Sequence, residues 1–227
     1  MWPLSSDECY VSVDIESDGP IPGVYSMLSL GAAAFDAEGQ LLDTWTANLE
    51  QLPDAGEHPR TMRWWAAHVD AWEAARTDPQ PPASAIPAFV AWAEALRTTA
   101  GWPVMVAFPA AFDALWVEWY CHRFAGASPF RRRCIDLRTL VMVAMGAGYR
   151  EGGKSSLPQD WRTGTGAHTH LAVDDAHEQG RLFFRIVREL GVQRGDVALA
   201  LEPPAAAAPT DKGFRRQRQA ARARRRG

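Results

Sequence analysis

The stretch Tyr10-Val-Ser-Val-Asp-Ile-Glu16 alternates apolar and polar side chains, which is the two-residue period of a β-strand. Successive side chains of a strand point to opposite faces, so Asp14 and Glu16 leave the same face. Two neighbouring carboxylates repel each other and raise each other's pKa unless a cation lies between them. Mg²⁺ and Mn²⁺, which take oxygen ligands, fit such a pair. An ordinary solvated strand face is the alternative, because Asp-x-Glu is a common pattern.

Further segments on both sides of this strand predict the fold class. Strand-like apolar segments cover 27–35, 40–49, 104–108 and 133–137. Helices are predicted from helical spacing, or from their place in the alternating order, over 60–75, 84–96, 112–124, 139–145 and about 169–190. A Gly-rich loop covers 146–166. This order, a three-strand meander followed by alternating strands and helices, predicts an α/β fold with a mixed five-stranded sheet flanked by helices. A doubly wound α/β fold is the alternative.

The composition predicts a globular protein. The chain has 227 residues, of which 47% are hydrophobic and 22% charged. Three scattered cysteines are too few for a disulfide framework or a structural zinc site, which favours a reducing cytoplasm. The opening residues have neither the basic start nor the apolar stretch of a signal peptide, and no apolar run is long enough to cross a membrane. We therefore expect a cytoplasmic protein without a membrane partner.

The charge is distributed unevenly along the chain. The net charge is −3, but the residues from Lys212 onward carry eight positive charges and no negative ones, so the rest carries −11. We expect a domain over 1–201, followed over 202–227 by a Pro/Ala linker and a basic, disordered tail. An acidic domain should repel nucleic acid. Bound divalent cations would reverse that sign locally, and the basic tail could attract polyanions.

Two further segments carry candidate functional residues. Asp113 follows a short apolar strand at the start of a predicted helix, where ligands of α/β proteins often gather. Near the end of the domain, His168-Thr-His170-Leu-Ala-Val-Asp174-Asp175-Ala-His177 places Asp175 on a helix from which it can point back to the sheet. An imidazole such as His170 can accept a proton at neutral pH. Acidic residues that favour a helix start, or cap it, are the alternative for both segments.

Together these segments resemble the motifs of the DEDDh exonucleases, which include oligoribonuclease, RNase T and the proofreading subunits of DNA polymerases. Asp14-Ile-Glu16-Ser-Asp-Gly19 matches the family's Asp-x-Glu and its small-residue loop. Phe112-Asp113 matches its aromatic–Asp pair, and His170-Leu-Ala-Val-Asp-Asp175 matches its His-x-Ala-x-x-Asp. The phrase from Asp18 to Gly31 resembles a little-characterised bacterial branch. The resemblance implies a ribonuclease-H-like exonuclease fold.

The resemblance also implies a two-metal mechanism. Its metal ligands would be Asp14, Glu16, Asp113 and Asp175, holding two Mg²⁺ or Mn²⁺ ions. One ion would lower the pKa of a water, His170 would accept its proton, and the hydroxide would attack the last phosphodiester. The spacing to Asp175 favours His170 over His168 as the base. The implied substrate is the 3′ end of single-stranded RNA or DNA, with short RNA preferred, released as nucleoside 5′-monophosphates.

Substrate contacts are implied at three further positions. Ser17 and Gly19 follow the first motif, where the family meets the terminal nucleotide. Trp65 resembles a position from which oligoribonuclease-like members stack on a base, and a core tryptophan is the alternative. One departure is that Pro109 stands where the family often has Asn, and Phe108 where His can precede it. Many relatives are homodimers, so the resemblance adds a homodimer to the expected partners.

Two other classes of protein stay open. A compact His/Asp metal centre could hydrolyse nucleotides with five residues of the third segment: His168, His170, Asp174, Asp175 and His177. Such a phosphohydrolase would need neither Asp14 nor Glu16. Alternatively, a non-catalytic nucleic-acid-binding module could keep the exonuclease fold and engage RNA through the arginine tail. The intact set of acids argues against this module.

Overall fold

The computed structural model describes residues 4–162 and 169–197. Residues Met1–Val192 form one compact unit. Of the second unit, Gln193–Gly227, only the last helical residues are described. The predicted linker and basic tail over 202–227 and the rival base His168 lie outside the described residues. The described helices include none that combines the length and the apolar character of a membrane span.

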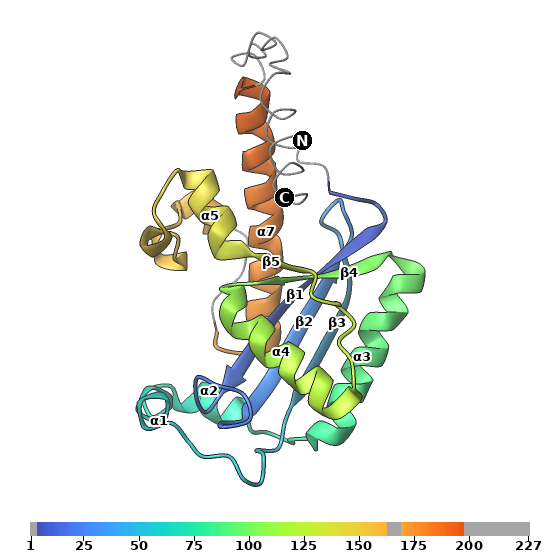
Figure 1. Cartoon of the computed structure of the whole chain (residues 1–227). Helices are drawn as coiled ribbons and strands as arrows, with labels where there is room; N and C mark the ends of the chain where they lie inside the picture. The colour runs from blue at the N-terminus through green and yellow to red at the C-terminus, as the bar shows by residue number, and fades with distance from the viewer. Residues whose placement is uncertain (1–3, 163–168, 198–227) are drawn as a thin grey trace, which may run out of the picture. The chain divides into compact units, whose positions relative to one another are not determined.

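A mixed five-stranded sheet lies at the centre of the first unit, as the sequence predicts (Figure 1). Its strands are β1 (Glu8–Ser17), β2 (Met27–Phe35), β3 (Leu41–Asn48), β4 (Trp102–Ala107) and β5 (Cys134–Asp136). The strand order is β3-β2-β1-β4-β5. The pairs β1–β2 and β2–β3 are antiparallel, and β1–β4 and β4–β5 are parallel. The strand that carries Asp14 and Glu16 is therefore the central one.

The helices that follow are α1 (Pro59–Trp65), α2 (Val69–Ala74), α3 (Pro82–Thr99), α4 (Ala110–Ala125), α5 (Leu137–Met145), α6 (Gln159–Arg162) and α7 (Ala172–Val197). The prediction of one helix over 60–75 is wrong, because the chain leaves helical geometry at His68. There the backbone N–H groups of Ala67 and His68 bond three residues back, which closes α1. The predicted loop over 146–166 contains α6 and two 3₁₀ turns, η1 (Tyr149–Glu151) and η2 (Lys154–Ser156).

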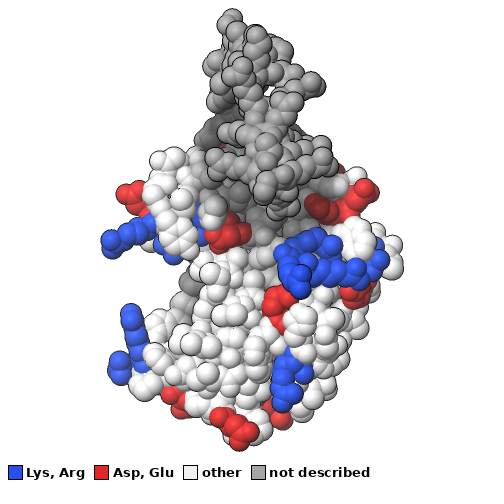
Figure 2. All heavy atoms as spheres, viewed as in Figure 1, with Lys and Arg blue, Asp and Glu red and all other residues white. Residues whose placement is uncertain are grey.

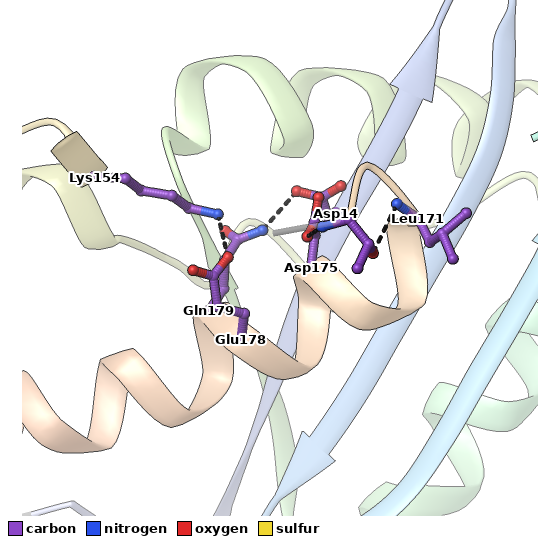
Figure 3. Close-up of polar contacts among 7 residues, drawn as sticks. Asp14, Lys154, Leu171, Asp175, Glu178 and Gln179 are labelled. Atoms are coloured by element: carbon purple, nitrogen blue, oxygen red, sulfur yellow. Dashed lines mark hydrogen bonds and ion pairs between the residues drawn. The ribbon is translucent and has the colours of Figure 1, made fainter. Parts of the chain in front are cut away.

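Two hydrophobic layers cover the two faces of the sheet. Val11, Val13 and Ile15 pack with buried residues of α3 and α4, which confirms the predicted apolar face of β1. On the other face, Tyr10 packs with buried residues of α5 and α7. At about 25 cal/mol per Å² of apolar surface, this burial is the main stabilising contribution to the fold. Asp14 and Glu16 alternate with Val13 and Ile15 along β1 and so lie on the second face, and Figure 3 shows Asp14 beside α7.

Small residues let α7 approach the sheet closely. A Cβ atom on Gly31 would lie 2.2 Å from the carbonyl carbon of Ala172, and one on Gly180 would lie 2.2 Å from the Phe35 ring. Ala176, midway between these two positions of α7, is fully buried. Gly31 is also the register partner of Asp14. The start of α7 is thereby held beside the carboxylates of β1.

Candidate active site

Four carboxylates from three elements gather at one end of the sheet. Asp14 and Glu16 come from β1, Asp113 from the first turn of α4, and Asp175 from the first turn of α7. The charges of Asp113, Glu16 and Asp175 all act on Asp14. Figure 3 shows Asp14 and Asp175 pointing toward each other between β1 and α7. The structure thus brings together the four acids that the sequence analysis selected.

Burial makes this cluster electrostatically costly. Asp113 is 3% exposed and Asp175 is fully buried, while Asp14 and Glu16 are half-buried. Loss of solvation, followed by repulsion from its three neighbours, raises the pKa of Asp14 well above its usual value. Burial likewise raises the pKa of Asp113 to about 7. Lys154 opposes both shifts through its positive charge.

The donor set fits divalent cations. Ligand atoms of Glu16, His170 and Asp175 all lie within 4.8 Å of one another. The four acids offer oxygen ligands, the type that Mg²⁺ and Mn²⁺ take. Cations bound here would also offset the like-charge repulsion that raises the pKa of Asp14. The residues present therefore match the group that the resemblance implies.

His170 lies at the edge of the acid cluster in an uncommon backbone conformation. Its φ is 58°, in the left-handed region that costs a non-glycine residue on the order of 1 kcal/mol or more. The N–H of Thr169, just before it, donates to Asp175 Oδ1 over 3.1 Å. The His170 ring makes edge contacts with Trp64 and His68, with ring centroids 4.9 and 5.0 Å apart. Trp64 and His68 stack on each other, and their shared contact with the ring helps to set the position of this imidazole.

Open space borders His170 on two sides. One pocket, of about 180 Å³, lies between Ser29 and Thr46 of the sheet and Leu171. A shallower one, of about 440 Å³, is lined by His68 and Thr169 among others. The half-buried imidazole is therefore accessible to small molecules such as water.

The sequence analysis missed Gln179 and Lys154. Gln179 is fully buried one helical turn after Asp175, and its Nε2 donates to Asp14 Oδ1 over 2.6 Å (Figure 3). Lys154 Nζ lies 2.9 Å from Glu178 Oε2, which ties the loop after α5 to α7. The i, i+4 spacing from Asp175 could have indicated Gln179. Nothing in the sequence around Lys154 signals its position.

Of the predicted substrate residues, Ser17 and Gly19 lie in a packed turn at the end of β1, and Trp65 of α1 packs against that turn. Ser17 is buried, and its hydroxyl donates to the carbonyl of Gly19 over 2.8 Å. Gly19 leaves no room for a Cβ atom, which would lie 2.2 Å from the Tyr25 ring. Trp65 is 2% exposed, and its indole N–H donates to the Ser17 carbonyl over 2.9 Å. The buried Trp65 ring therefore fits the core tryptophan that was the alternative and offers no stacking surface, whereas its neighbour Trp64 is 38% exposed.

Other polar residues of the third segment face elsewhere. Asp174 accepts a hydrogen bond from the Thr169 hydroxyl over 3.1 Å. His177 Nε2 lies 3.1 Å from Thr44 Oγ1, and burial lowers the pKa of this histidine. Among the described residues, neither joins the group formed by Glu16, His170 and Asp175. The described residues of the third segment therefore give no support for the compact His/Asp centre.

Pro109 takes the N-cap position of α4. Phe108, which precedes it, packs against the layer of α5 and α7. Asp136 at the end of β5 ties this corner together by accepting from the N–H groups of Ala110 (3.0 Å) and Thr139 (3.1 Å). At this corner, where the family often has Asn, hydrogen bonds from backbone N–H groups to Asp136 hold the starts of α4 and α5 instead.

The fold and the site define a ribonuclease-H-like domain with the acidic pattern of the DEDDh exonucleases. No family model matches the chain. The chain is 29% identical in sequence to the 3′-5′ DNA exonuclease Cap18 of Escherichia coli over 188 residues. The aligned region covers 82% of this chain and 95% of that protein.

Solved structures show the same fold. The nuclease domain of 3′hExo, a DEDDh family member bound to rAMP, superposes with a TM-score of 0.59 at 10% identity, over 82% of this chain and 92% of that one. E. coli exonuclease I in complex with a dT13 oligonucleotide superposes with a TM-score of 0.57 at 16% identity, over 85% of this chain. The chain spans 43% of exonuclease I. The comparisons confirm the resemblance to the DEDDh-type exonucleases and support a 3′→5′ exonuclease.

Proposed function

We propose that the protein is a metal-dependent 3′→5′ exonuclease that releases nucleoside 5′-monophosphates from single-stranded nucleic acid. The observation that carries the proposal is the convergence of four carboxylates from β1, α4 and α7 beside His170. The similarity to a named 3′-5′ exonuclease over 82% of the chain supports the same reaction.

Asp14, Glu16, Asp113 and Asp175 would hold two divalent cations, with Mg²⁺ and Mn²⁺ matching their oxygen donors. The cations would supply Lewis-acid activation of water and would stabilise charge on the departing 3′ oxygen. The buried carboxylates keep their geometry through α7: Gln179 orients Asp14, and the Thr169 N–H orients Asp175. Fixed orientation matters because a ligand that must reorganise loses metal affinity and rate.

His170 would act as the general base. A ring nitrogen of His170 lies within 4.8 Å of carboxylate oxygens of Glu16 and Asp175 and beside open space, where a water molecule can reach it. It would take the proton of the attacking water as the new P–O bond forms and the P–O3′ bond breaks. The edge contacts with Trp64 and His68 would limit the rotation of the ring between turnovers.

We propose single-stranded DNA ahead of RNA as the substrate. The support is the relative at 29% identity, which is named as a DNA exonuclease. The solved neighbours include structures with both chemistries, dT13 on exonuclease I and rAMP on 3′hExo. The expectation of short RNA rests on the sequence resemblance alone, so both sugars belong in the test.

The test is a degradation assay on DNA and RNA oligonucleotides of equal sequence, labelled at the 5′ end, with Mg²⁺ or Mn²⁺. Asp175→Asn and His170→Gln should each slow cleavage at least about a hundredfold, because each removes a group that acts on the reacting atoms. Asp174→Asn and His177→Gln are matched controls on the same segment and should cleave like wild type. Equal losses in Asp174→Asn and Asp175→Asn would refute the assignment.

A further inference from the structure

Three arginines surround one tryptophan far from the carboxylates. The guanidinium carbons of Arg97, Arg133 and Arg131 lie 3.8, 4.7 and 5.3 Å from the ring centroid of Trp102. The three charges therefore lie within about one Debye length, ~10 Å at 0.1 M salt, of one another. Figure 2 shows basic side chains concentrated in this region, where the end of α3 meets the start of β4. We call these four residues the Trp102 cluster.

The charges of the Trp102 cluster are poorly neutralised within the described part of the chain. Arg97 has a long ion pair, 3.7 Å, with Glu94, and the two side chains are 39% and 38% exposed. Arg131 forms no ion pair with a described carboxylate. Arg133 Nε donates to the Pro103 carbonyl over 3.3 Å, while its Nη2 is buried without a hydrogen-bond partner. Glu94 and Glu8, the register partner of Trp102, are the carboxylates near the cluster, so three guanidinium groups converge on one ring with few acidic partners. Converging guanidinium groups of this kind can bind phosphate.

The backbone presents these arginines in a strained turn. Arg131 and Arg132 both adopt left-handed φ values, 50° and 67°. Such conformations are rare for residues with side chains and are concentrated at binding and active sites. Both side chains are exposed, and Arg131 is the one that reaches the Trp102 ring. Because 1–211 carries −11 in total, a local group of three arginines runs against the overall charge.

The Trp102 cluster and the acid site lie toward opposite ends of the same pair of strands. Trp102 is the register partner of Glu8, and Asp14 lies six residues further along β1. At about 3.3 Å per residue the separation along the strand is about 20 Å. At the duplex rise of about 3.4 Å per nucleotide, roughly six stacked nucleotides would span this distance, and an extended single strand would need fewer.

We propose that the Trp102 cluster is a second nucleic-acid site, which binds phosphates in the 5′ part of a single strand whose 3′ end lies at the carboxylates. The proposal rests on the exonuclease function proposed above. Arg97 lies over the Trp102 ring at 3.8 Å, so the indole holds a guanidinium in place rather than stacking on a base. Contacts of this kind tolerate any sequence, and they would make long strands better substrates than trinucleotides.

The experiment measures binding and cleavage separately, with the full-length chain. The variant Arg97→Gln/Arg131→Asn removes two charges and keeps a residue that tolerates left-handed φ at 131. Binding of a fluorescent 16-nucleotide single-stranded DNA is followed by anisotropy in EDTA at several salt concentrations. We expect about tenfold weaker binding at low salt and a salt slope shallower by about 1.4, at roughly 0.7 per lost phosphate contact. With Mg²⁺, kcat/KM on a trinucleotide should stay at the wild-type value.

Arg123→Gln/Arg188→Gln is the matched control, because it removes the same charge from two exposed arginines outside the cluster. The proposal is overturned if Arg97→Gln/Arg131→Asn binds the 16-nucleotide strand with the same affinity and the same salt slope as this control. Poly-glutamate that competes as well as the oligonucleotide at equal charge would also overturn it, in favour of an acidic protein partner. If the wild type binds the strand through the cluster but cuts nothing, the exonuclease function fails and the binding site stands.

Discussion

Replacing Gln179 with leucine removes the hydrogen bond that its Nε2 donates to Asp14 Oδ1 while keeping a side chain of similar volume. The bond is short, 2.6 Å, and Gln179 is fully buried, so a leucine at 179 fills the space and leaves Asp14 Oδ1 without this donor. A hydrogen bond to a charged group contributes about 1.5–3 kcal/mol. If that free energy holds Asp14 in its metal-binding orientation, its loss corresponds to roughly a 10- to 100-fold change.

The assay is a Mn²⁺ titration, read by calorimetry and by cleavage of a 5′-labelled DNA strand. We expect Gln179→Leu to weaken Mn²⁺ binding by at least tenfold and to lower kcat/KM in parallel. Gln179→Glu should behave differently with pH, because a protonated Glu donates to Asp14 as Gln does and an ionised Glu repels it. Its activity relative to wild type should therefore fall as the pH rises. Arg188→Gln, on the exposed side of the same helix, is the control.

The reasoning is refuted if Gln179→Leu binds Mn²⁺ within twofold of wild type at an unchanged melting temperature. A flat pH ratio for Gln179→Glu would refute the orientation argument as well, because a purely structural role in the core would not depend on the charge of residue 179.

Three other predictions address the electrostatics, packing and aromatic residues of the site. The metal-free protein should lose stability as the pH rises from about 4 to about 7, since burial raises the folded-state pKa of Asp113 to about 7 and folding then favours its protonated form. Mg²⁺ should restore the thermal midpoint at pH 8, and a midpoint unaffected by both changes would contradict this. Gly31→Ala should lower the midpoint by roughly 5 °C and reduce activity, because the new Cβ meets the α7 backbone, whereas Gly56→Ala, with open space, should do neither. Trp65→Ala should cost about 3–5 kcal/mol in denaturant unfolding, while Trp64→Ala should weaken DNA binding at nearly unchanged stability; the reverse pattern would refute the assignment.

The strands and the acids could be predicted from the sequence because both depend on local patterns. The period of two along β1 shows which face carries Asp14, and the order of elements indicates a mixed sheet. The boundaries of short helices were harder to predict. The break at His68 depends on local hydrogen bonds that no periodicity shows.

Contacts between distant segments could not be predicted. Gln179 and Asp14 are 165 residues apart, and their hydrogen bond exists because Gly31 lets α7 lie close to the sheet. Which of Trp64 and Trp65 is buried also depends on packing. The two are adjacent at the end of the short helix α1, and only the tertiary structure shows that Trp65 faces the core. Sequence spacing gave no means of choosing between them.

The most direct test of the account is the position of a bound cation, measured by anomalous diffraction from crystals soaked in Mn²⁺. The account predicts manganese peaks among the carboxylates of Asp14, Glu16, Asp113 and Asp175, within reach of His170. Manganese bound at Asp174 and His177, or no peak at the four carboxylates at millimolar Mn²⁺, would contradict it.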